Sequence, residues 1–287
     1  MVNFVKIFLL AVFFGLAINV SAQPGVFQPG DYRDGVYDKE NAVNRRYIPY
    51  THLREADVTW QKRVWRRIDM REKQNQPLYF PKEIVVGRMS LMQVVLKYIL
   101  NGQIIAFEDD GFLKPYELTK IRQKVVIQPT DSVDQVGINE AGEEVITKIL
   151  PPADSLWMFE NFTSLELKED WFFDKQKSSL EVRILGMSFY ATKKGKEDAG
   201  EMLQFCTYFP ACRPFFAKHE VYNVKNDSER RTFEDIFWKR QFSSVAIKES
   251  NMYDRSIDSY SKGIDALLES DRIKYDIFKY EHDMWHF

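Results

Sequence analysis

Four short runs in the middle of the chain are the strongest indication of its fold: FTSLEL (Phe162–Leu167), DWFF (Asp170–Phe173), LEVRIL (Leu180–Leu185) and MLQFCTYF (Met202–Phe209). They are rich in aromatic and β-branched residues, and polar breaks such as KQKS at 175–178 separate them. Runs of this kind are typical of β-strands. The sequence therefore predicts an antiparallel or mixed sheet in which the first two runs form a hairpin.

Helical patterns precede these runs. Trp60, Val64 and Ile68 recur at spacings of four and predict an amphipathic helix. A second helix is predicted to begin after Ser90, which is a favourable N-cap residue, and to stop at Asn101–Gly102.

A long helix is predicted at the end of the chain. One apolar stripe recurs at spacings of three and four, and a second stripe resumes on a rotated phase. The first is Ile257, Tyr260, Ile264, Leu267 and Leu268, and the second is Ile273, Ile277, Tyr280 and Met284. Such a helix either bends near Ser270 or is covered on two sides. Strands in the middle with helices at both ends indicate an α+β fold, with a central sheet flanked by N-terminal helices and a long C-terminal helix.

Residues 1–22 are predicted to be a cleavable secretory signal. Lys6 supplies a positive start, Ile7–Ile18 an uncharged apolar core, and Val20–Ala22 a cleavage site of small residues. The apolar core is short for a membrane span, which needs about 20 residues. We therefore expect an exported protein with no transmembrane segment in its mature chain.

The rest of the chain is predicted to divide into an arm, residues 23–56, and an α+β domain, residues 57–287. Two Pro-Gly pairs and the lack of a sustained period indicate that the arm is extended. It either covers its own domain or orders on a neighbour. A lobe boundary is possible near residues 128–142, which are polar and without a period. The formal net charge of −2 provides no field that would attract nucleic acid.

Three arginines are the candidate partner interface. On the predicted helix at Trp60, Arg63, Arg66 and Arg67 lie away from the apolar face. Like charges at such spacings repel, and the sequence shows no intramolecular reason to hold the three arginines so close together. Either an acidic partner surface contacts this basic face or the face is simply solvated.

Cys206 and Cys212 leave two states open. In a continuous strand their Cα atoms would lie about 20 Å apart, well beyond disulfide reach, but Pro210 indicates a turn between them. An exported protein permits a disulfide between Cys206 and Cys212. Two separate thiols are the other possibility.

The search for catalytic motifs predicts no catalytic residue, no cofactor and no metal. His282 and His286 are four residues apart but lack the glutamate of a metalloprotease helix. Gly137–Gly142 has the glycine spacing of a phosphate loop, but Glu143 and Glu144 stand where lysine and serine or threonine would be needed. Paired carboxylates leave no local pattern, so an exported hydrolase or ligand-binding module is the alternative function.

Several blocks of this sequence resemble one family. They are WQKRVWRRIDMREKQNQPLYFP (Trp60–Pro81), KEDWFFDKQKSSLEVRILG (Lys168–Gly186), YFPACRPFF (Tyr208–Phe216), FEDIFWKRQF (Phe233–Phe242) and KESNMYDRSIDSY (Lys248–Tyr260). These blocks are similar to the GldN/PorN family of gliding-motility and type IX secretion proteins of Bacteroidetes. These blocks identify no catalytic group.

The resemblance implies a structural role in the periplasm. It implies that many copies assemble with an outer-membrane lipoprotein, GldK/PorK-like, into a large ring. It also implies contact with the periplasmic part of the inner-membrane motor, GldM/PorM-like, and a non-enzymatic function.

Overall fold

A computed structural model describes residues 44–83, 88–125, 133–138, 144–149, 161–192, 200–223, 226 and 228–284. The predicted signal, residues 1–22, lies outside the described residues, as does the arm before residue 44. Residues 133–138, within the proposed lobe boundary, form strand β3 (Val133–Ile138), which pairs with β4 (Glu144–Ile149). This polar segment without a period therefore contains a strand, and the lobe boundary there stays a prediction.

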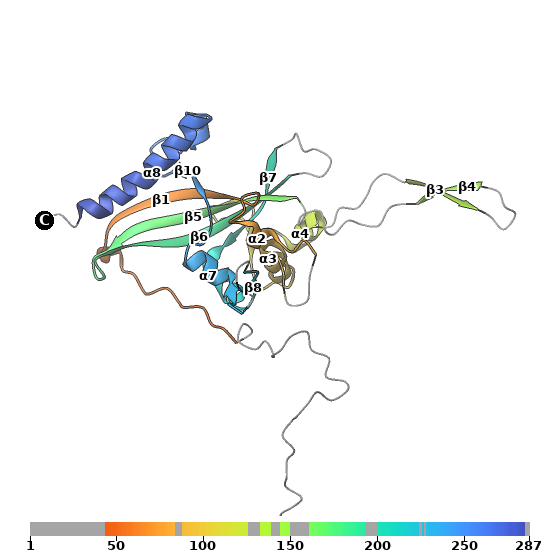
Figure 1. The fold of residues 1–287 in the computed structure, drawn as a ribbon, viewed down its shortest axis with the longest axis horizontal. Helices are drawn as coiled ribbons and strands as arrows, with labels where there is room; N and C mark the ends of the chain where they lie inside the picture. The colour runs from red at the N-terminus through yellow and green to blue at the C-terminus, as the bar shows by residue number, and fades with distance from the viewer. Residues whose placement is uncertain are drawn as a thin grey trace, which may run out of the picture. The chain divides into compact units, whose positions relative to one another are not determined.

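A six-stranded sheet organises the described domain (Figure 1). Its strand order is β10-β1-β5-β6-β7-β2, and every neighbouring pair is antiparallel. The strands are β1 (Val58–Asp69), β2 (Ala106–Phe107), β5 (Phe162–Asp174), β6 (Ser179–Thr192), β7 (Glu201–Tyr208) and β10 (Val245–Glu249). The small strands β8 (Glu220–Val221) and β9 (Arg231–Thr232) pair separately. The predicted α+β class is confirmed.

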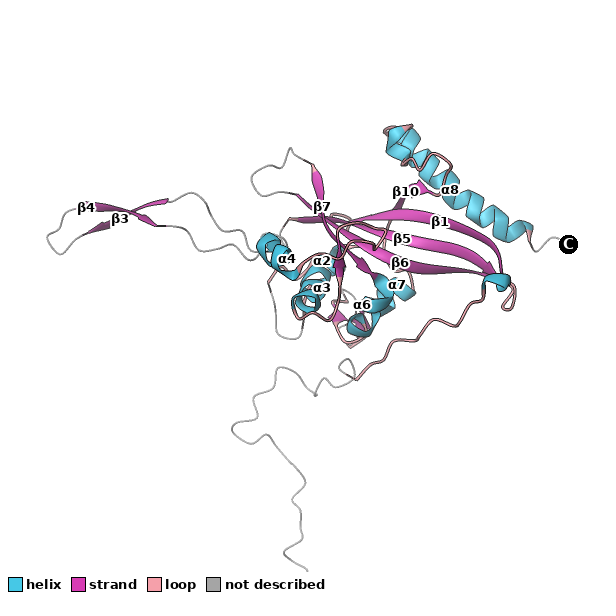
Figure 2. Ribbon diagram, turned by 180° about the vertical axis from the view of Figure 1, so that it is seen from behind, coloured by secondary structure: helices cyan, strands magenta, loops and turns pink. Residues whose placement is uncertain are grey.

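Helices lie around the sheet (Figure 2). The α-helices are α2 (Gln76–Tyr79), α3 (Leu91–Leu100), α4 (Leu118–Val125), α6 (Phe209–Phe216), α7 (Phe233–Trp238) and α8 (Ile264–Asp283). Short 3-10 turns are η1 (Glu55–Asp57) and η3 (Ile257–Ser259). The helix predicted after Ser90 is confirmed as α3. Its capping box joins Ser90 and Gln93, because each side chain accepts a hydrogen bond from the other's backbone amide.

The helix predicted at Trp60 was wrong, because these residues form the long strand β1. A spacing of four satisfies a helical turn, but it also returns to the same face of a strand, whose side chains alternate. Val64 and Ile68 are both buried on one face of β1. The abundance of tryptophan and β-branched residues in the segment agrees with the strand.

The first two central runs do not form a hairpin with each other. They belong to the single strand β5, which continues from Phe162 through Asp174. The hairpin is instead β5–β6, and the polar residues 175–178 are its turn. Ser178 has a positive φ of 51° there.

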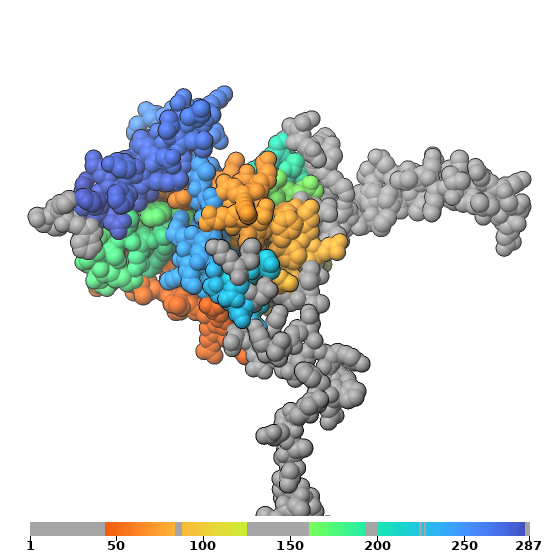
Figure 3. Space-filling model, viewed as in Figure 1, coloured from red at the N-terminus to blue at the C-terminus, as the bar shows by residue number. Residues whose placement is uncertain are grey.

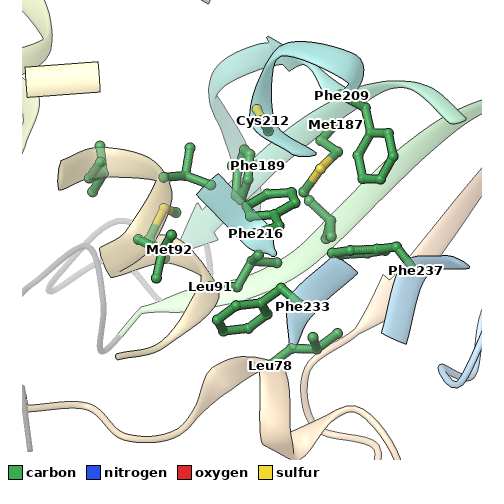
Figure 4. Close-up of a cluster of buried hydrophobic side chains, with 14 of the residues drawn as sticks. Leu78, Leu91, Met92, Met187, Phe189, Phe209, Cys212, Phe216, Phe233 and Phe237 are labelled. Atoms are coloured by element: carbon green, nitrogen blue, oxygen red, sulfur yellow. The ribbon is translucent and has the colours of Figure 1, made fainter. Parts of the chain in front are cut away.

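A large core fills one end of the sheet beneath α3, α6 and α7. Aromatic rings from the two later helices converge on it: Phe216 packs against Phe233 and Phe237 with centroid separations of 6.1 and 5.8 Å. Leu91 of α3 enters the same cluster from the opposite side (Figure 4). We call this the main core; Ile68, Leu165 and Leu167 supply its sheet side.

A second, smaller cluster lies beneath α8. Ile273 and Ile277 pack with Val64 of β1 and Ala246 of β10. The Ala246 amide donates to Ser270 Oγ at 2.9 Å, which attaches the helix to the edge strand. The predicted second stripe therefore contacts the sheet. Helix α8 runs without interruption through Ser270, where a bend was one of the two predicted alternatives. The first stripe was wrong at its start, because Ile257 and Tyr260 lie before α8. Ile257 is its one buried member.

Candidate partner-binding surfaces

The polar face of the β1–β5 pair holds two of the three predicted interface arginines. Arg63 lies opposite Asp170 in the strand register, and Arg67 lies opposite Glu166. Arg63 Nε donates to Asp170 Oδ1 at 2.6 Å, and Arg67 Nη2 donates to Glu166 Oε1 at 2.6 Å. Opposite charges directly across two strands stabilise the pairing. Both arginines therefore have intramolecular partners.

Arg66 points to the other face of the sheet, because side chains alternate along a strand. Its Nε donates to Ser244 Oγ at 2.9 Å, and burial lowers its pKa. Glu169, fully buried on that face, pairs with Arg240 at 2.9 Å. The three arginines thus form no single basic surface, and the argument that they lack intramolecular partners was wrong.

An acidic turn completes the polar face. Asp110 accepts a hydrogen bond from Trp65 Nε1 at 2.8 Å, and its backbone carbonyl accepts one from Lys168 at 2.8 Å. The ring of Phe112 lies directly on Gly186, where a Cβ would overlap it. The turn therefore packs on the sheet at a position where glycine leaves room for the Phe112 ring.

A buried arginine attaches the N-terminal segment to the domain. Arg213 of α6 donates from Nε to Glu234 Oε1 of α7 at 2.9 Å and from Nη2 to the Ile48 carbonyl at 2.6 Å. Its guanidinium lies 4.1 Å from the centroid of the Tyr50 ring and 5.1 Å from that of Trp238. Burial raises the pKa of Glu234, and the charge of Arg213 opposes that rise. We call this group the Arg213 latch.

The latch was missed by sequence reasoning. A charged residue within the apolar run FPACRPFF was its one local signal, because an arginine is rarely buried unless paired. Its partners lie far away in the chain. Beside the latch is a pocket of about 350 Å³, lined by residues that include Pro49, Tyr50 and Val182.

Both cysteines are free thiols and buried. Cys206 lies on β7, where its Sγ is 3.2 Å from Ser188 Oγ, and Cys212 lies on α6, where its Sγ donates to the Tyr208 carbonyl at 3.4 Å. Burial raises the pKa of Cys206 to about 11 and that of Cys212 to about 12. Neither is an activated nucleophile, since reactive cysteines have depressed pKa values.

His219 has a structural position. Its Nε2 lies 3.0 Å from the Tyr98 hydroxyl, and burial, with the charges of Lys97 and Lys218, lowers its pKa to about 4. Among the residues that the structure describes, no three His, Cys, Asp or Glu side chains are grouped to hold a metal. His282 lies on α8, and His286 is outside those residues.

The outer face of α8 is the most apolar exposed helix surface described. Its side chains are 55 to 75% exposed. They are Ile264, Leu267, Leu268, Tyr275 and Phe278, which we call the outer α8 face. Figure 3 shows α8 as a blue ridge along the margin of the domain. In the described part of the chain, no helix combines the length and the apolarity needed to cross a membrane.

This fold and these surfaces define an α+β protein whose exposed apolar helix is suited to binding other proteins. A family model, described as gliding motility associated protein GldN, matches residues 53–286. The chain therefore belongs to the GldN family and is a component of gliding motility and type IX secretion. No curated protein matches it. The resemblance seen in the sequence blocks is confirmed.

Proposed function

We propose that this protein is a periplasmic structural subunit of the type IX secretion and gliding machinery. Many copies assemble with an outer-membrane lipoprotein, GldK/PorK-like, into a large ring. The ring contacts the periplasmic part of the inner-membrane motor, GldM/PorM-like, and transmits its work. The subunit is non-enzymatic: it acts by assembly and by transmitting force.

The observation that carries this proposal is the family match over residues 53–286, which includes nearly all of the described domain. The outer α8 face supports it, because exposed apolar patches of this kind are typical of protein interaction sites. The predicted secretory signal at residues 1–22 supports a location outside the cytoplasm.

The polar sheet face is a second surface in this proposal. The side chains of Arg63 and Arg67 remain 38% and 37% exposed while paired, so a partner can contact their outer edges. Charge reversal there is a poor interface test, because Arg63→Glu would place a carboxylate opposite Asp170. Arg63→Gln keeps a hydrogen-bond donor and removes only the charge.

Affinity purification from gently solubilised native membranes tests the assembly. The tagged protein should sediment as a large complex and should bring down a lipoprotein and a motor subunit, identified by mass spectrometry. An unrelated exported protein with the same tag is the control. Two results together would contradict the proposal. The protein would sediment as a small particle without a lipoprotein, and a strain that lacks the gene would still secrete normally. Intact mass of the purified chain, expected to begin at Gln23, tests export.

A further inference from the structure

We propose that the outer α8 face is a self-association surface on which α8 of a second copy packs antiparallel, about a two-fold axis beside Asp271. The proposal deepens the assembly function and rests on it, since it specifies one contact between copies. It is carried by the exposure, the spacing and the charges of this helix.

The first observation is that α8 is apolar on two opposite sides. Ile273 and Ile277 face the sheet and are buried, whereas Ile264, Leu268 and Tyr275 project to the other side. A helix that is apolar on two opposite sides needs a covering surface on each side to bury both. The five exposed side chains offer on the order of 500 Å² of apolar surface. Two copies would bury about 1,000 Å² together, the lower limit for a specific interface.

The second observation is the spacing of these side chains about Asp271. Ile264 and Phe278 lie seven residues before and after it, and Leu267 and Tyr275 lie four before and after it. In an antiparallel pair centred on Asp271, Ile264 faces Phe278 of the second copy, and Leu267 faces Tyr275. The aliphatic half of each helix therefore packs on the aromatic half of the other. A two-fold contact requires such self-complementarity.

The charges on the helix fit the same arrangement. Asp271 accepts a hydrogen bond from Lys274 at 3.1 Å within its own helix. In the antiparallel pair, Lys274 of the second copy lies at the level of Leu268 along the helix, within one turn of Asp271. Two lysines thus flank the two aspartates at the axis. Asp265 and Lys279 share one flank of the face, so the pairing also brings Asp265 toward Lys279 of the second copy.

An anionic lipid surface fits this face less well. Helices that lie on such membranes present unpaired lysine and arginine along the polar flank. Here Arg272 pairs with Glu269 at 2.5 Å and with Asp276 at 2.8 Å, and Lys274 pairs with Asp271. The flanks alternate in sign rather than being basic. A second copy is the occupant that both the spacing and the charges match.

A two-fold contact has a consequence for the assembly. It closes on itself and joins two copies, so it cannot extend around a ring, which needs a head-to-tail contact through another surface. An assembly that uses the α8 contact throughout therefore contains an even number of copies.

Sedimentation velocity of the mature chain, residues 23–287, over a concentration series tests the pairing. The wild type should form a dimer. Leu267→Glu and Tyr275→Lys should each weaken dimerisation at least tenfold, because each places a charge against an apolar group. The double variant should recover dimerisation, since the pairing puts Glu at 267 opposite Lys at 275. Met252→Glu, an 87% exposed site off the helix, is the control and should leave the dimer unchanged.

Circular dichroism should show all variants folded, since positions 267 and 275 are exposed. A monomeric wild type, or single variants that still dimerise, would overturn the proposal. A double variant no better than the single ones would overturn the antiparallel register. The outer α8 face would instead be assigned to a membrane if the wild type stayed monomeric and bound vesicles of anionic lipid while Leu267→Glu did not bind them.

Disulfide trapping gives an independent test. Asp271→Cys should give a cross-linked dimer on mild oxidation, and the wild type should not, because both native cysteines are buried. Absence of the cross-link would count against an axis at this residue. Purification with the lipoprotein is measured separately, so loss of that partner with an intact dimer would overturn the ring function and leave the α8 contact standing.

Discussion

Helices α3 and α8 both carry apolar side chains at helical spacing but differ in how they are covered. Seven of the ten residues of α3 are buried, whereas three of the twenty residues of α8 are buried. Helix α3 begins at a capping box on Ser90, and α8 begins at Gly263 without a side-chain cap. One helix is part of the domain's core, and the other is attached to it along a single face.

Apolar periodicity thus identifies a helix face that must be buried, but it does not identify the surface that buries it. For α3 the cover is the chain's own sheet and helices. For the outer α8 face the described residues supply none, so the same pattern indicates an interaction surface. Measurements that separate folding stability from assembly test this contrast between the two helices.

The largest effect is expected at the Arg213 latch, on the α3 side of the molecule. Arg213→Met should reduce the free energy of unfolding by about 3 to 5 kcal/mol, because it leaves Glu234 buried without its partner. Chemical denaturation measures this. Replacing both partners, Arg213→Met with Glu234→Leu, should recover part of the loss. A single variant as stable as the wild type would show that the latch is dispensable.

A matched leucine pair tests the comparison directly. Leu91→Ala in α3 should cost about 3 kcal/mol, because Leu91 is fully buried in the main core. Leu268→Ala in α8 should change the stability of the monomer by less than about 0.5 kcal/mol, because its side chain is 62% exposed. Urea melts of dilute protein measure both. Equal losses would mean that the outer α8 face is covered within the monomer.

The pH dependence of stability is a smaller effect, expected beside α3. Burial lowers the pKa of His219 from 6.5 to about 4. The unfolded chain therefore binds more protons between these values, and the free energy of unfolding should fall as the pH drops through that window. Because the ring is partly exposed, we expect a loss of about 1 to 2 kcal/mol. His219→Gln should flatten this part of the curve, and an unchanged slope would contradict the assignment.

The smallest effect is expected on the polar sheet face. Arg67→Gln should cost less than about 1 kcal/mol, since the pair with Glu166 is partly exposed. Thermal melts beside Arg213→Met would compare two Arg–Glu pairs that differ mainly in burial. Similar losses of stability for Arg67→Gln and Arg213→Met would show that burial does not set how much an Arg–Glu pair contributes.

The sequence was sufficient where the signal is local. The capping box at Ser90 involves residues three apart, and the predicted helix there was confirmed. The central runs were correctly predicted as strands from their composition. The prediction failed at Trp60 because a spacing of four fits both a helix and a strand. It failed for the hairpin because two polar residues, Lys168 and Glu169, interrupt β5 without ending it.

The α+β class, the helix after Ser90 and the family could be predicted from the sequence, because each depends on neighbouring residues or on short blocks. The three-dimensional packing was needed to establish that β1 is a strand in the interior of the sheet, that Arg63 and Arg67 are paired, and which face of α8 is covered. The physical reason is the distance along the chain. Arg63 and its partner Asp170 are 107 residues apart, and Arg213 and the Ile48 carbonyl are 165 apart. Such contacts exist only after the sheet has formed, because no local periodicity specifies which strand or helix will lie opposite.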